Sequence, residues 1–138
     1  MNQRFYLSII LFLLCFSVMS KPSTIKISIG AKAFYATLKE SESVNAFIKQ
    51  LPLTLSMEEL NGNEKYAELK YPLPTQAESI GKIQTGDLLL YGNNVLVLFY
   101  ESFATPYRYT RLGHVHDTLG LSKALGAGNC QVLFEANP

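Results

Sequence analysis

The sequence predicts a mainly β protein: a small closed barrel of about eight strands with two capping helices. The strongest indication is the stretch 86–100, where two apolar, β-prone runs flank Gly92-Asn93-Asn94, residues that accept the positive φ of a tight hairpin. Residues 95–99 are apolar at every position, so neither face of this strand suits water. Because antiparallel strands with one wet face alternate, we expect a barrel whose exterior is covered at this strand.

The segment that follows the amino-terminal region alternates between apolar and polar residues. Residues 24–29 place three isoleucines on one face, and residues 33–38 return after a glycine-containing turn. This period of two predicts a hairpin with one face in the core and the other in water.

The pattern changes to a helical period between residues 41 and 51. Apolar side chains recur at i, i+3, i+4 and i+7, which places them on one face of a helix. They are Val44, Phe47, Ile48 and Leu51. Ser41 or Ser43 can cap the amino end, and Pro52 ends the helix. We expect the apolar face to lie over the barrel as a lid.

The rest of the domain is assigned from the same two periods and from turn residues. Asn61-Gly62-Asn63 is a strong turn signal between two short strands. The expected strands are residues 53–57, 66–69, 82–85, 107–115 and 131–135, the expected loops are residues 71–79 and 101–106, and a second helix is expected at residues 119–125 with Asp117 or Thr118 as its cap.

Residues 1–20 have the pattern of a secretory signal peptide. A short positive start that contains Arg4 precedes an apolar run at residues 5–19. This run of about 15 residues is shorter than the roughly 20 that a membrane-spanning helix needs. An uncleaved membrane anchor is the alternative.

A cleavage site is expected directly after this apolar run. Val18-Met19-Ser20 places small or tolerated residues at the positions that a signal peptidase reads, before Lys21. We therefore expect residues 21–138 to form one exported domain, periplasmic or secreted.

The charge balance of this domain excludes some partners. Removal of residues 1–20 leaves 118 residues with eleven basic and eleven acidic side chains, because Arg4 is the one charge lost. A neutral chain with dispersed charge has no electrostatic footprint for nucleic acid or acidic membranes. We expect no nucleic-acid partner, and membrane association only through an uncleaved signal segment. The length suits one domain with a hydrophobic core.

Two sets of residues have some features of chemical sites. His114-Val115-His116-Asp117 places two histidines on one strand face beside a carboxylate, but a zinc site needs a further ligand and the sequence has no other histidine. Cys130 is the single cysteine after residue 20 and lies beside an apolar run. We interpret the histidines as exposed strand-end residues and the cysteine as a small buried residue. No metal and no cofactor are predicted.

Several longer motifs follow one another along the predicted barrel. They are Leu51-Pro52-Leu53-Thr54-Leu55, the stretch 59–66, Gly86-Asp87-Leu88 with the hairpin after it, and Tyr109-Thr110-Arg111-Leu112-Gly113. In this order they resemble the bacterial cyclophilin-like domain family, over residues 25–135. The resemblance implies a closed β-barrel of the cyclophilin type with helices over its ends. It does not imply an activity, because fold does not determine function.

Catalysis by true cyclophilins depends on a block that this sequence lacks. In those isomerases a catalytic arginine, a phenylalanine and a Gln-Gly-Gly-Asp-Phe-like stretch line the proline pocket. The sequence contains no such block and no tryptophan. No cyclophilin catalytic residue is therefore assigned to a position here.

A segment of arginines and aromatic residues is the best candidate for a ligand site. Arginine offers a planar fork for carboxylate or carbonyl groups, and aromatic rings offer flat apolar walls. Because side chains alternate along a strand, Arg108 and Arg111 face opposite sides, so at most one of them faces a given pocket. The predicted ligand-binding residues are Tyr66, Phe103, Tyr107, Tyr109 and Arg111.

Two other interpretations of these segments stay open. An arginine of the aromatic segment can instead pair with a carboxylate such as Glu101. The polar loop that contains Asn61 and Glu64 can present both side chains to a ligand, although turn chemistry alone accounts for its asparagines and glycine.

The residues leave two functions open. The first is a non-catalytic barrel that binds a small molecule or a peptide in the cell envelope, and it is favoured because the sequence shows no catalytic set. The second is a divergent peptidyl-prolyl cis-trans isomerase. In that case Arg108 or Arg111 would supply the donor aimed at the proline nitrogen.

Overall fold

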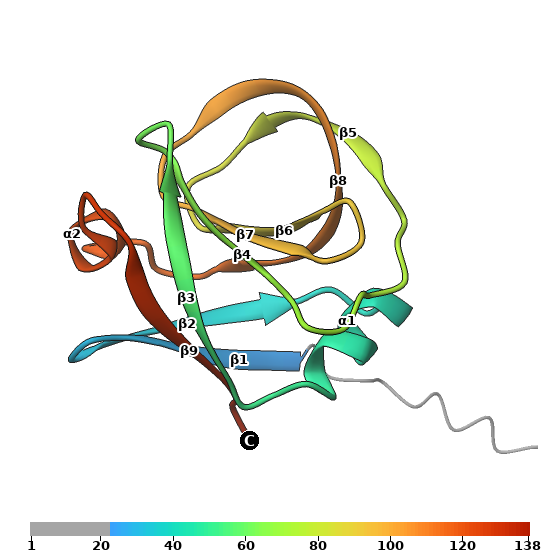
Figure 1. Cartoon of the computed structure of the whole chain (residues 1–138), viewed down its shortest axis with the longest axis horizontal. Helices are drawn as coiled ribbons and strands as arrows, with labels where there is room; N and C mark the ends of the chain where they lie inside the picture. Colours follow the sequence, from blue (N-terminus) through green and yellow to red (C-terminus); the bar gives the residue numbers. More distant parts are fainter. Residues whose placement is uncertain (1–22) are drawn as a thin grey trace, which may run out of the picture.

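Eight antiparallel strands close into a barrel in the computed structural model, which describes residues 23–138. The strands of this part of the chain are β1 (Ser23–Ile29), β2 (Lys32–Leu38), β3 (Leu53–Leu60), β4 (Glu64–Glu68), β5 (Glu78–Ile83), β6 (Asp87–Tyr91), β7 (Val95–Phe99), β8 (Phe103–Val115) and β9 (Cys130–Ala136), and the helices are α1 (Glu42–Ile48) and α2 (Leu121–Leu125). Around the barrel the order is β2-β1-β9-β3-β4-β7-β6-β8, and pairing of β8 with β2 completes the ring (Figure 1). β5 is an additional strand that pairs with β8 outside the ring. The predicted closed barrel is confirmed.

One large apolar cluster fills the inside of the barrel. Ile25, Ile27 and Ile29 of β1 are all buried in it, as their alternation predicts. Helix α1 contributes Phe47, whose ring packs edge-on against Phe134 of β9 with 6.1 Å between the ring centroids. The helical period at residues 41–51 therefore identified a face that packs on the core.

Helix α1 begins where the sequence predicts and ends earlier. The side-chain oxygen of Ser41 accepts a hydrogen bond from the backbone N–H of Val44 at 3.1 Å, so Ser41 is the N-cap. The helix ends at Ile48 instead of Leu51. A final turn follows, in which the N–H of Leu51 donates to the carbonyl of Ile48 at 3.1 Å.

The cap predicted for the second helix is wrong. Helix α2 starts at Leu121, and its N-cap is Gly120, which has a φ of 80° and makes no side-chain capping bond. Asp117 instead accepts a hydrogen bond from the N–H of Leu119 at 3.0 Å, in the turn before the helix. Within residues 23–138 no helix has the length and apolar character needed to cross a membrane.

A second apolar cluster lies on the outside of the barrel wall. β5 and the first half of β8 curve over β6 and β7 (Figure 1) and bury Leu89, Val97 and Phe99 against Ile80 and Ile83. β7 is therefore apolar throughout because one face meets the barrel interior and the other meets this cover. The covered exterior expected from the sequence is confirmed.

The covering strands differ from their sequence-based assignment. β8 starts at Phe103, so the loop expected at residues 101–106 is wrong beyond residue 102. β5 also begins before the expected segment 82–85. The reason is the ladder between these strands, in which Lys82 lies opposite Ala104. Each segment is extended because the other supplies its hydrogen bonds. Such pairing is difficult to predict from the residues of either segment alone.

A buried lysine connects β3, β4 and the segment after α2. Lys65 is fully buried, and its Nζ donates to Glu59 Oε1 at 3.0 Å and to the carbonyl oxygens of Gly126 and Gly128 at 2.8 and 2.5 Å. The hydroxyl of Tyr100 also donates to Glu59. Burial, followed by this bond, raises the pKa of Tyr100 to about 12. Because a buried charge must be paired and hydrogen-bonded, these contacts hold the chain after α2 on the barrel.

The seam that closes the ring depends on a glycine. Gly113 of β8 lies opposite Leu38 of β2. A Cβ at position 113 would overlap the backbone oxygen of Thr37 and would also press on Leu38. The two backbones therefore approach more closely here than any other residue type allows.

We expect Gly113→Ala to lower the free energy of unfolding by about 2–3 kcal/mol, because the methyl group must push β2 away from β8. Gly128→Ala is the matched control, since nothing lies within 4 Å of a Cβ there. Its effect should stay within about 0.5 kcal/mol. Urea denaturation measures both. Equal stability of the two variants would show that the seam tolerates a side chain.

Candidate functional site

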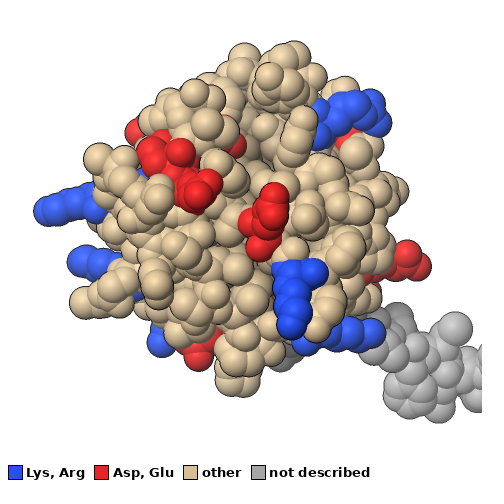
Figure 2. Space-filling model, viewed as in Figure 1, with Lys and Arg blue, Asp and Glu red and all other residues tan. Residues whose placement is uncertain are grey.

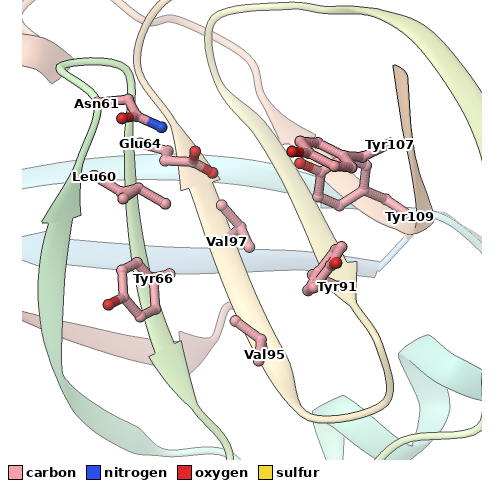
Figure 3. A pocket seen from close by; sticks show the side chains of 9 residues that line it. All are labelled: Leu60, Asn61, Glu64, Tyr66, Tyr91, Val95, Val97, Tyr107 and Tyr109. Carbon is pink, nitrogen blue, oxygen red and sulfur yellow. The ribbon is translucent and has the colours of Figure 1, made fainter. Parts of the chain in front are cut away.

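A pocket of about 380 Å³ opens on the outer face of the barrel, beside the second apolar cluster. Residues from β3, the turn after it, β4, β6, β7 and β8 line it (Figure 3). They are Leu60, Asn61, Glu64, Tyr66, Tyr91, Val95, Val97, Tyr107 and Tyr109. We call this cavity the tyrosine pocket.

Strand register brings the walls of the tyrosine pocket together. Tyr66 on β4 lies opposite Val97 on β7, and Tyr91 on β6 lies opposite Val95. Because side chains two residues apart share a face, Glu64 joins Tyr66, and the two valines form the floor between the strands. β8 supplies the remaining wall.

The tyrosines form a connected aromatic group. The Tyr91 ring lies 6.2 Å from that of Tyr107 and 5.7 Å from that of Tyr109, between centroids, and Tyr109 packs edge-on against Phe99 at 5.7 Å. Tyr109 is buried, whereas Tyr91 and Tyr107 are 48% and 58% exposed. One ring is thus anchored in the second apolar cluster and two form an open rim.

Glu64 is the one charged residue that lines the pocket. It is only 8% exposed, and burial, together with the charge of Glu59, raises the pKa of Glu64 to about 6. Within residues 23–138 no hydrogen bond or salt bridge involves its carboxylate. Figure 3 shows the carboxylate pointing across the cavity toward the side of Tyr107 and Tyr109.

The turn between β3 and β4 serves both structure and pocket. Asn61 and Gly62 have φ values of 56° and 68°, the left-handed conformation that a tight hairpin requires. Asn61 also lies at the pocket rim. Turn chemistry and presentation to a ligand, both left open by the sequence, are therefore compatible.

The structure brings three of the five predicted ligand-binding residues into this pocket: Tyr66, Tyr107 and Tyr109. Phe103 packs behind it against Phe99, with 5.8 Å between the ring centroids. Arg111 lines a separate hollow between β2 and β8. Sequence reasoning missed Tyr91, Val95 and Val97 as pocket residues. Because successive side chains of a strand point to opposite faces, the two strands of the predicted 86–100 hairpin could have placed these three side chains on one face.

Both arginines of the described chain have protein partners. Arg111 Nε donates to Glu78 Oε1 at 2.5 Å, and Arg108 Nη2 donates to the carbonyl of Ala77 at 2.8 Å. Arg111 thus pairs with a carboxylate, as the alternative interpretation expected, but this carboxylate belongs to Glu78 of β5 and not to Glu101. The Arg111 guanidinium lowers the pKa of Glu78.

The histidine pair and the cysteine lie elsewhere. His114 and His116 are both exposed, with 6.0 Å between their ring centroids, and His116 is hydrogen-bonded to Thr37. Within residues 23–138 no three His, Cys, Asp or Glu side chains form a group that could hold a metal ion. Cys130 is half-buried, and burial raises the pKa of its thiol.

A family model described as the cyclophilin-like family matches residues 27–135. The chain belongs to the cyclophilin-like family. Among solved structures, this cyclophilin-like barrel is similar to the hypothetical protein AF2241 from Archaeoglobus fulgidus, with 21% sequence identity and a TM-score of 0.62. The likeness covers 84% of this chain and 95% of that chain, and it supports the fold. No curated protein matches the chain.

The environment of Glu64 leads to a prediction about stability. Its pKa of about 6 exceeds the ordinary value of 4.5, so Glu64 favours folding below pH 4.5 and disfavours it once the pH rises through 6. Because solvent screens part of the charge, Glu64→Gln should raise the free energy of unfolding by about 1 kcal/mol at pH 7.5. It should give no gain at pH 4.5, where the carboxyl group of the folded protein is protonated.

Urea denaturation at the two pH values measures this effect. Glu68→Gln removes an exposed carboxylate from the same strand and is the matched control, for which we expect no pH-dependent gain. A loss of stability for Glu64→Gln at pH 7.5 would mean that the Glu64 carboxylate has a stabilising partner.

Proposed function

We propose that this cyclophilin-like barrel is a non-catalytic binding module that takes a small organic ligand in the tyrosine pocket. The observation that carries the proposal is a preformed, mostly apolar concavity that contains one carboxylate, Glu64, with no partner among residues 23–138. Its volume of about 380 Å³ lies within the range of small-molecule sites, which combine apolar walls with a few polar groups that orient the ligand.

The residues of the pocket favour binding over chemistry. General acid–base catalysis uses groups that titrate near the operating pH. Glu64 is one such group, but the other ionisable residues in the lining are tyrosines. Burial and the charge of Glu64 raise the pKa of Tyr109, and a hydrogen bond to Glu58 raises that of Tyr66. The hydroxyls of Tyr66 and Tyr109 therefore stay protonated at neutral pH and act as hydrogen-bonding groups.

We do not extend the proposal to prolyl isomerisation. That alternative needs a donor aimed at the proline nitrogen from a wall of the apolar pocket. Arg111 is engaged by Glu78 and Arg108 by the carbonyl of Ala77, both outside the tyrosine pocket. No contact in residues 23–138 supports that activity for either arginine.

Charge on the surface fits a small neutral or weakly charged ligand better than a polyelectrolyte. Charged side chains of both signs are dispersed among uncharged ones on the face shown in Figure 2. The described chain therefore offers no continuous basic track of the kind that holds a nucleic acid on this face.

Tyr107→Ala tests the location of the site. Its ring is 58% exposed, so its removal should leave stability nearly unchanged while it opens one wall of the pocket. In a screen of small aromatic and aliphatic molecules by protein-observed NMR, we expect hits to shift pocket resonances and to weaken about tenfold in this variant. Tyr71→Ala is the control, because Tyr71 is equally exposed and lies outside the pocket. Equal weakening in both variants would place the site elsewhere.

We also propose that the protein is exported and cleaved before Lys21. This rests on the sequence pattern of residues 1–20, which lie outside the described residues. The barrel begins at Ser23 and makes no disulfide within residues 23–138, so a chain that starts at Lys21 should fold without an oxidant. Intact mass of the protein recovered from the cell envelope measures cleavage. A species that keeps residues 1–20 would identify a membrane anchor.

A further inference from the structure

We infer that the ligand of the tyrosine pocket is an organic cation, a protonated or methylated amine on a small apolar body, held between the Glu64 carboxylate and the tyrosine rings. The inference rests on the proposed function and deepens it, because it names the chemical class of the ligand.

The Glu64 carboxylate lacks a counter-charge among the described residues. Glu64 is only 8% exposed, so its carboxylate is partly desolvated, and it has no donor or cation within residues 23–138. A desolvated carboxylate costs free energy until a cation or strong donors reach it. A ligand that supplies a positive charge removes this cost, whereas an anion would increase it.

The neighbouring lysine, Lys65, already has its hydrogen-bond partners elsewhere. Lys65 follows Glu64 in β4, and strand alternation sends its side chain to the opposite face. There its Nζ donates to Glu59 and to the carbonyls of Gly126 and Gly128, inside the barrel wall. The protein thus carries a cation beside Glu64 in sequence and keeps it on the other side of the sheet.

The aromatic walls of the tyrosine pocket also suit a cation. The faces of aromatic rings carry negative electrostatic potential and attract cations, and organic ammonium groups are bound in this way. Tyr66, Tyr91, Tyr107 and Tyr109 come from three strands and surround the cavity that Glu64 enters. Val95 and Val97 form an apolar floor suited to the body of the ligand.

Titration of Glu64 gives the binding of a cation in the tyrosine pocket a pH dependence. The titratable groups that line the pocket with it are the tyrosines of β4, β6 and β8. The charged groups nearest to it are Glu59 of β3, and Lys65 of β4 on the opposite face of the sheet. The pKa of Glu64, at about 6, falls in the range where the folded protein can be studied. A cation prefers the ionised carboxylate, so its affinity should rise as the pH increases through 6.

The test compares three probes of similar size and different charge: 2-phenylethylamine, 2-phenylethanol and phenylacetate. Binding to the folded protein is followed by NMR titration and isothermal calorimetry at pH 7.5 and pH 5. We expect the amine to bind about tenfold more tightly than the alcohol at pH 7.5 and to lose about tenfold at pH 5, while phenylacetate binds least.

Glu64→Gln should reduce the affinity for the amine about tenfold and leave that for the alcohol within about twofold. Glu68→Gln removes a charge from the same strand outside the pocket and should change neither affinity. The urea denaturation described above establishes that both variants are folded.

Each other outcome identifies which statement fails. If the alcohol or phenylacetate binds as well as the amine, or if Glu64→Gln leaves the amine unaffected, the inference is wrong and the binding function stands. If none of the three probes shifts resonances of the pocket lining at millimolar concentration, the tyrosine pocket is not a ligand site, and the proposed function fails with the inference.

Discussion

The double pairing of β8 is the constraint on which the rest of the structure depends. Its second half pairs with β6 and β2 and closes the ring at Gly113, while its first half pairs with β5 outside the ring. The register slips at Leu112 on the β6 side and near Gly81 on the β5 side, and such bulges bend a strand. The bent strand can therefore close the barrel and still curve over its outer wall.

The same curvature creates the tyrosine pocket. β8 covers the wall at Phe99 and leaves an opening where Tyr107 and Tyr109 stand opposite β4. Tyr109 is fixed because its ring packs on Phe99, whereas Tyr107 is 58% exposed at the rim and contacts the ring of Tyr91. The pocket therefore combines a ring anchored in the second apolar cluster with two exposed rings at its rim.

Two adjacent charges on β4 illustrate how the two faces of a sheet give neighbouring residues different surroundings. Lys65 points into the barrel and finds every partner it needs in Glu59 and two backbone carbonyls. Glu64 points outward into the tyrosine pocket and finds none within residues 23–138. A paired buried charge contributes to a unique fold, while an unpaired one is a cost that a ligand can relieve.

The sequence by itself determined the fold class and those parts of the local structure that depend on neighbouring residues. The turn at Gly92, the isoleucines of β1 and the Ser41 cap are short-range features, because backbone conformation and side-chain period depend on neighbours in the chain. The family resemblance then identified the barrel. The tertiary structure alone decided which faces meet: it added Tyr91 to the pocket and placed Arg111 against Glu78. The alternation of residues along the sequence shows that a side chain points to one side of a strand. Only the order and register of the strands show which residues lie on that side.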